Sequence, residues 1–133
     1  MKRTELMIDD WVLYKNKPAK ITLMHKTSFT DVISVYYKDD KFDVADIEEL
    51  SGIKITPEII ESIGFIKVCS FDTKNECELY KHSENKSFFI YKKDNEKDII
   101  LYFYMGELEI KIKYVHELQN VMNILGLNSN VEL

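Results

Sequence analysis

Alternation of apolar and polar residues dominates the second half of the chain and predicts strands. Leu108, Ile110 and Ile112 alternate with charged residues, which is the period of a strand with one buried face. The same alternation recurs in four earlier segments separated by short polar turns. The five expected strands are residues 65–71, 76–82, 87–93, 98–104 and 107–113. Because no helix separates them, antiparallel hairpins are the economical connection, and we expect a β-meander.

Two segments change to the helical period. At the end of the chain, apolar residues recur at helical spacing before Gly126, and we expect this helix to pack its apolar stripe back on the sheet. The stripe consists of Val115, Leu118, Met122 and Leu125. In the middle of the chain, Thr56 can cap a short helix, Pro57 suits its first position and Gly64 suits its end.

Residues 1–50 show a less regular alternation that predicts a small antiparallel unit. We expect strands at residues 11–15, 19–25, 32–37 and 42–44, with a short strand or helical turn at residues 46–50. A turn is expected at residues 16–18. The chain is therefore expected to be an α+β protein. Residues 1–50 would form a bent sheet or SH3-like barrel, and residues 51–133 the meander with its two helices. The two units can also form one compact domain.

Composition supports a folded protein outside the membrane. The 133 residues are 45% hydrophobic, which is ample for a core, and their net charge of −5 makes nucleic acid an unlikely partner. No apolar run is long enough for a signal peptide or a membrane span. We therefore expect a cytoplasmic protein with Cys69 and Cys77 as free thiols. A four-residue turn would place Cys69 opposite Glu78 and Cys77 opposite Ser70.

Three short motifs carry a resemblance to a known family. They are residues 10–12, Asp-Trp-Val; residues 56–58, Thr-Pro-Glu, followed by Gly64 and Phe65; and residues 112–120 around Tyr114. Together they resemble a family of small uncharacterised proteins of Bacteroides-type gut bacteria and their phages and mobile elements. The resemblance spans most of the chain. It implies a phage or mobile-element setting and no catalytic residues.

The motifs of catalysis and metal binding are absent from the sequence. Residues 39–49 hold six acids, but the glycine and glutamate that an EF-hand loop requires are missing. His25, His82 and His116 are not at metal-ligand spacing. Neither a nucleophile elbow nor a phosphate-binding glycine loop occurs. We therefore expect no catalytic residue, no metal and no cofactor.

Two surfaces are candidates for binding. Four polar residues of the last helix, His116, Gln119, Asn120 and Asn123, gather opposite its apolar stripe and could bind a partner, although a solvated helix face is the simpler interpretation. Tyr102 and Tyr104 place aromatic rings on a strand face that could be a second contact surface. Residues 86–93 interleave aromatics with lysines, as in sheets that stack single-stranded bases, but core packing with a solvated edge is favoured.

The sequence thus favours a non-catalytic protein-interaction module whose partner is another protein, and the resemblance implies a phage or mobile-element origin. Two alternatives remain open. The protein could bind a small ligand or nucleotide through its aromatic and amide groups, or it could be a nucleic-acid-associated accessory protein. The sequence does not define the oligomeric state.

Overall fold

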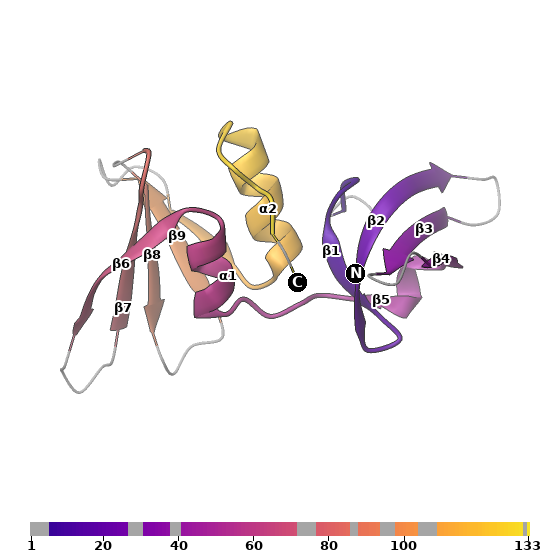
Figure 1. Cartoon of the computed structure of the whole chain (residues 1–133), viewed down its shortest axis with the longest axis horizontal. Coiled ribbons are helices and arrows are strands. Elements are labelled where there is room, and N and C mark those ends of the chain that lie inside the picture. Colours follow the sequence, from indigo (N-terminus) through magenta and orange to yellow (C-terminus); the bar gives the residue numbers. More distant parts are fainter. Residues whose placement is uncertain are drawn as a thin grey trace. The chain divides into compact units, whose positions relative to one another are not determined.

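The computed structural model describes residues 6–26, 31–37, 41–71, 77–85, 88–93, 98–103, 109–131 and 133. It divides the chain into two compact units. The first joins Met1–Lys54 to Tyr114–Ser129 and Leu133, and the second joins Ile55–Lys113 to Asn130–Glu132. Each unit contains one antiparallel sheet and one α-helix (Figure 1), which confirms the α+β arrangement. The last helix belongs to the first unit, whereas a domain boundary at residue 50 stays a prediction.

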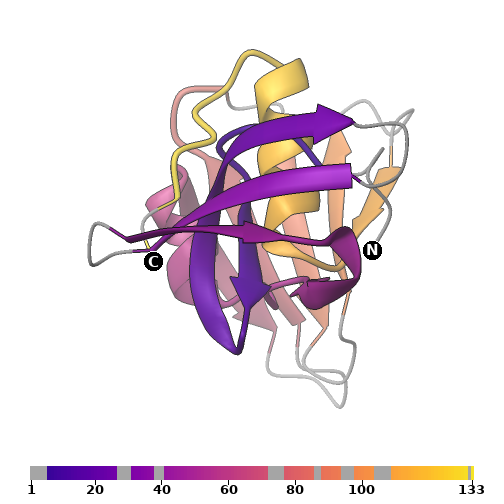
Figure 2. The same ribbon diagram turned by 90° about the vertical axis from the view of Figure 1, so that its right-hand side faces the viewer.

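The first unit contains a five-stranded sheet with the strand order β4-β3-β2-β1-β5. The strands are β1 (Trp11–Tyr14), β2 (Lys17–Lys26), β3 (Asp31–Tyr37), β4 (Lys41–Ala45) and β5 (Leu50–Ser51). A 3-10 turn, η2 (Ile47–Glu49), precedes β5, in line with the short strand or helical turn expected there. The long strand β2 is bent (Figure 2), and its register with β3 shifts at Ile21. The described strands form no closed barrel, because β4 and β5 remain the two ends of the sheet.

The turn of the first hairpin is formed by residues 15 and 16, whereas the sequence predicted a turn at residues 16–18. Lys15 and Asn16 both have positive φ, 49° and 62°, and Tyr14 pairs directly with Lys17. Two successive residues with positive φ define the two-residue turn whose twist matches the flanking strands. Pro18, expected in the turn, instead lies in β2 opposite Leu13.

The core of the first unit lies on one face of its sheet. Alternate strand residues are buried there, together with residues that precede β1 and form β5. These residues are Leu6, Val12, Tyr14, Ala19, Ile21, Ile33, Val35, Ala45 and Leu50. The other face carries Leu23, Phe42 and Val44, which are all more than half exposed.

Helix α2 (Val115–Ile124) completes the first unit. It begins after Tyr114, whose backbone bridges Lys54, and Gly126 with φ of 72° follows its end as expected. Leu118 and Met122 of its apolar stripe are fully buried. No described helix is both long and apolar enough to span a membrane.

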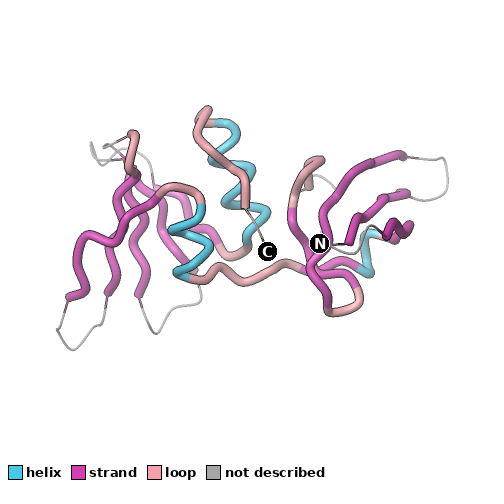
Figure 3. Tube along the Cα trace, in the orientation of Figure 1, coloured by secondary structure: helices cyan, strands magenta, loops and turns pink. Residues whose placement is uncertain are grey.

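The second unit confirms the meander. Its sheet has the order β10-β9-β8-β7-β6, so every strand pairs with its neighbour in sequence. The strands are β6 (Phe65–Phe71), β7 (Cys77–His82), β8 (Phe88–Lys93), β9 (Ile99–Phe103) and β10 (Glu109–Ile112). Helix α1 (Pro57–Ser62) precedes β6 and contacts it (Figure 3).

The signals that predicted α1 all function as expected. Thr56 accepts a hydrogen bond from the Ile59 N–H at 3.4 Å, and Pro57 is the first helical residue. Gly64 has φ of 101° and lies between α1 and β6. A two-turn helix cannot be stable alone, so Ile59 and Ile60, both buried, hold it in place.

Replacing Gly64 by valine should lower the free energy of unfolding by at least about 1 kcal/mol, because a β-branched residue is strained at this φ. A Cβ atom would also lie 3.4 Å from Nε2 of His82. The melting temperature of Gly64→Val measures the effect. An unchanged melting temperature would show that this conformation is not required.

The register of β6 and β7 differs from the expected one. Phe71 pairs with Cys77, and Cys69 pairs with Leu79 after a shift next to Lys67. Five residues rather than four separate the two strands, so the prediction that Cys69 faces Glu78 and Cys77 faces Ser70 is wrong. The two cysteines are two register positions apart.

The absence of a disulfide stays a prediction, now on a different ground. Residues two register positions apart on neighbouring strands have Cα atoms about 7–8 Å apart, whereas a disulfide requires less than about 7 Å. Titration with a thiol reagent should therefore detect both Cys69 and Cys77 after unfolding without reductant. Recovery of a single thiol or none would contradict this.

Candidate functional site

The polar face of α2 is largely buried. His116 and Gln119 are only 1% and 6% exposed, Asn120 is half-buried, and Asn123 alone is exposed. The interpretation of this face as a solvated surface is therefore wrong for His116 and Gln119. The helical period placed these residues on one side but could not reveal that residues before β1 and after α2 cover that side.

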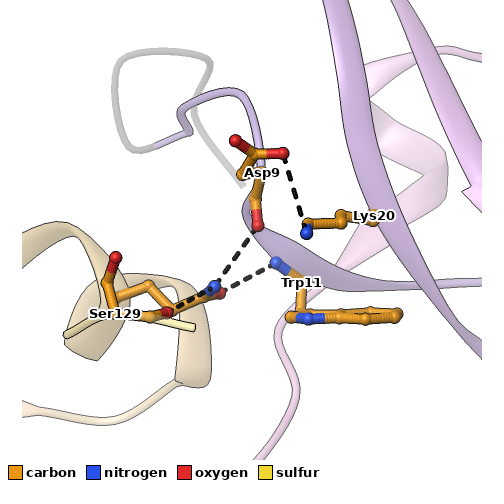
Figure 4. A network of polar contacts seen from close by, with 5 residues as sticks. Asp9, Trp11, Lys20 and Ser129 are labelled. Carbon is orange, nitrogen blue, oxygen red and sulfur yellow. Dashed lines mark hydrogen bonds and ion pairs between the residues drawn. The ribbon is translucent and has the colours of Figure 1, made fainter. Parts of the chain in front are cut away.

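Gln119 binds three backbone groups of the first unit, two in residues 9–11 and one at Ser129. Its Oε1 accepts a hydrogen bond from the Trp11 N–H at 2.9 Å. Its Nε2 donates to the carbonyl of Asp9 at 3.2 Å and to that of Ser129 at 3.3 Å (Figure 4). Both amide protons are thus used within the protein, and the side chain substitutes for backbone partners at the start of β1.

Asn120 extends this network to a buried acid. Its Nδ2 donates to Oδ2 of Asp10 at 3.1 Å, and the Met7 N–H donates to the same oxygen at 2.8 Å. Asp10 is only 2% exposed. Burial raises the pKa of the Asp10 carboxyl from 3.8 to about 6, although the two donors oppose this and neighbouring Asp9 adds a smaller rise.

These contacts identify the network as structural. Asp9 pairs with Lys20 at 3.7 Å on its exposed side, and the buried bonds tie residues 7–11 to α2. The candidate binding residues Gln119 and Asn120 are occupied by their own chain. The sequence did not indicate Asp10 as a member of this network. Its role depends on the hydrogen bond from Asn120, which lies 110 residues away on α2.

The sheet of the second unit has one face covered by α1. Tyr80 is buried on this face, and its hydroxyl donates to Glu78 at 2.7 Å. Burial is the largest cause that raises the pKa of the Tyr80 hydroxyl. The carboxylate of Glu78 raises it further, and so do the charges of Glu61 and Glu58 of α1. The helix therefore lies over the Tyr80 side of the sheet.

The opposite side, which we call the open face, follows from strand alternation. None of its described residues is buried, whereas their strand neighbours on the α1 side mostly are. The open face comprises Ile66, Leu79, Lys81, Phe89, Tyr91, Ile100, Tyr102, Glu109 and Lys111. It brings the candidate Tyr102 together with aromatic residues of β8, whereas Tyr104 lies outside the described residues.

The aromatic residues of the open face form a cross-strand stack. Phe89 and Tyr102 pair in register, with ring centroids 5.3 Å apart and ring planes 11° from parallel. On the other side of β8, Lys81 Nζ lies 5.9 Å from the Phe89 ring centroid. Aliphatic Ile66, which is 59% exposed, extends the surface at β6. The result is an apolar centre with charged residues beside it.

The remaining sequence candidates have local structural roles. His82 is buried, and its Nδ1 accepts hydrogen bonds from the N–H groups of Glu84 at 3.2 Å and Asn85 at 3.0 Å. In the acidic segment, Asp43 accepts from the Tyr14 hydroxyl at 3.0 Å. The side chain of His25 lies outside the described residues. Within the described part of the chain, no group of three or more His, Cys, Asp or Glu residues could hold a metal ion.

Comparison with known proteins identifies no relative: no family model, no curated protein and no solved structure matches the chain.

Proposed function

We propose that this protein is a non-catalytic protein-interaction module that binds its partner through the open face of the second sheet. The observation that carries the proposal is an apolar centre, formed around Phe89, Tyr91 and Tyr102, with Lys81, Glu109 and Lys111 beside it on an uncovered sheet face. An apolar centre with a polar rim is the usual composition of a protein interface. Clustered exposed apolar residues on a folded domain mark interaction sites.

The geometry of the aromatic stack favours protein over single-stranded nucleic acid. A base stacks on the free face of an aromatic ring. In this stack Tyr102 lies on one face of the Phe89 ring and Lys81 on the other. Phe89 therefore presents its edge, which suits aliphatic and aromatic side chains of a protein partner. Aliphatic Ile66 extends this apolar character, and the net charge of −5 adds repulsion from phosphate.

Cytoplasmic localisation and the phage or mobile-element setting implied by the resemblance belong to the same proposal. Their support is the sequence alone: two cysteines outside any disulfide pattern, the lack of a long apolar run, and the motifs around Tyr114.

Affinity capture from the native host tests the proposal with matched variants. Ile66 on the open face and Val44 on β4 are aliphatic strand residues with 59% and 60% exposure, so lysine at either position should leave the fold intact. We expect wild-type and Val44→Lys protein to retain the same partner, and Ile66→Lys and Tyr102→Lys to reduce its binding at least about tenfold. Thermal unfolding checks that each variant is folded.

Two outcomes would contradict the proposal. One is equal capture of that partner by wild type, Ile66→Lys and Tyr102→Lys. The other is its loss from Val44→Lys alone, which would place the interaction surface on the first sheet around Leu23, Phe42 and Val44.

A further inference from the structure

His82 ends strand β7 and holds the following turn through its ring. The residue is only 2% exposed, and its Nδ1 accepts hydrogen bonds from the backbone N–H groups of Glu84 at 3.2 Å and Asn85 at 3.0 Å. A ring nitrogen that accepts a hydrogen bond carries no proton, so the neutral imidazole must hold its proton on Nε2. The turn therefore depends on one tautomer of His82.

The other side of the ring is enclosed by neutral groups. Nε2 is buried and has no hydrogen-bond partner among the described residues. It lies beside Gly64, since a Cβ atom on this residue would be 3.4 Å from Nε2. The Phe65 ring meets the imidazole edge-on, with centroids 5.0 Å apart and ring planes 84° apart. Only the Nδ1 side of the ring is thus bound to the backbone within the described part of the chain.

The charged groups on the elements around His82 are mostly directed to water or to other partners. Three exposed acids lie on these elements, namely Glu58 and Glu61 of α1 and Glu84 of the turn. Lys67, on the α1 side of β6, has its Nζ 3.4 Å from Glu78 of β7. Lys81 alternates onto the open face. Because water screens exposed charges, the acids attract a protonated ring too weakly to replace two hydrogen bonds.

We infer that His82 makes this turn pH-sensitive: the turn is closed while the ring is neutral and opens when the ring gains a second proton. An imidazolium ring donates from both nitrogens and accepts at neither. A proton on Nδ1 would face the N–H groups of Glu84 and Asn85, so the ring and the backbone must separate. Histidine ordinarily gains this proton within roughly pH 5 to 8. Acidification is therefore the trigger.

The turn lies next to the open face. Lys81 and Phe89 are the paired residues of β7 and β8 nearest to it, and Lys81 Nζ lies 5.9 Å from the Phe89 ring centroid. Opening of the turn removes the constraint at this end of the hairpin and so disturbs the stack on Phe89. This link to partner binding rests on the proposed function, whereas the switch itself does not.

NMR spectroscopy of the wild-type protein alone tests the inference. At pH 7 the ring nitrogens of His82 should show the neutral form with its proton on Nε2. Between about pH 7 and pH 4.5 we expect the ring to gain its second proton. Over the same interval the hydrogen-exchange protection factors of the Glu84 and Asn85 amides should fall at least about tenfold. The Ile60 amide, which bonds to the Thr56 carbonyl at 3.1 Å, is the control and should keep its protection.

His82→Asn is the matched variant. The Oδ1 of asparagine occupies about the position of Nδ1 and can accept from the same two N–H groups, but asparagine does not titrate. In this variant we expect the protection of the Glu84 and Asn85 amides to change less than about twofold between pH 7 and pH 4.5. If the variant does not fold, the wild-type titration decides alone.

Four results would overturn the switch. They are a proton on Nδ1 at pH 7, protection of both turn amides that stays unchanged down to pH 4.5, loss of Ile60 protection at the same pH, which indicates general unfolding, and an equal fall in protection in folded His82→Asn. These measurements need no partner. Failure of the switch therefore leaves the proposed function standing, and equal capture by Ile66→Lys, Tyr102→Lys and wild type would leave the switch standing.

Discussion

Replacing Gln119 by leucine should lower the free energy of unfolding by about 2 to 4 kcal/mol, although leucine is apolar and similar in size. The substitution removes the acceptor for the Trp11 N–H and the donors for the carbonyls of Asp9 and Ser129. A buried polar group that loses its partner costs about 1 to 3 kcal/mol. Because carbonyls near the surface can regain water, we expect less than the sum of three such losses.

Asn123→Leu provides the control for this prediction. Asn123 lies on the same helix but is exposed, so its replacement should change stability by no more than about 0.5 kcal/mol. Urea unfolding of both variants measures the difference. Equal stability of Gln119→Leu and wild type would mean that the network around Trp11 is not required for the fold.

Replacing Asp10 by asparagine should make the protein more stable near neutral pH. In the folded protein the pKa of Asp10 is about 6, above its ordinary value of 3.8, so the folded state binds this proton more tightly than the unfolded state. The resulting contribution to stability is complete below about pH 4 and is lost as the pH rises through 6. At about 1.4 kcal/mol per pKa unit, the loss is about 3 kcal/mol.

Asparagine at position 10 keeps an oxygen that can accept from the Met7 N–H and from Nδ2 of Asn120, but it does not ionise. The stability of Asp10→Asn minus that of wild type should therefore increase between pH 4 and pH 7 by up to about 3 kcal/mol. Urea unfolding of both proteins at a series of pH values measures this difference in stability. Groups that titrate in the same way in both proteins do not contribute to it. If the stability difference stayed constant between pH 4 and pH 7, folding would not raise the pKa of Asp10.

Local patterns in the sequence predicted the elements because each depends on near neighbours. Thr56, Pro57 and Gly64 define α1 through capping and backbone preference, and the meander follows from strand alternation. The register of Cys69 was missed because a one-residue change in turn length shifts every pair. Turn length also explains the error at Pro18. Because the turn consists of Lys15 and Asn16 alone, Pro18 lies in strand β2.

The candidate sites depended on distant partners and were predicted only in part. The helical period grouped Gln119 and Asn120 on one side of α2, but their partners, Trp11 and Asp10, are more than 100 residues away. No local pattern indicates that these partners cover the helix. Tyr102 was found because strand alternation exposes it, whereas its stacking on Phe89 requires the register between β8 and β9.

The most direct test of the central claim is hydroxyl-radical footprinting of the protein alone and in complex with its captured partner. This method measures the solvent access of individual aromatic side chains. We expect protection of Phe89, Tyr91 and Tyr102 in the complex, with no change at Phe42, which is 68% exposed on the first sheet. Protection of Phe42 with unchanged reactivity at Phe89, Tyr91 and Tyr102 would contradict the assignment of the open face as the interaction surface.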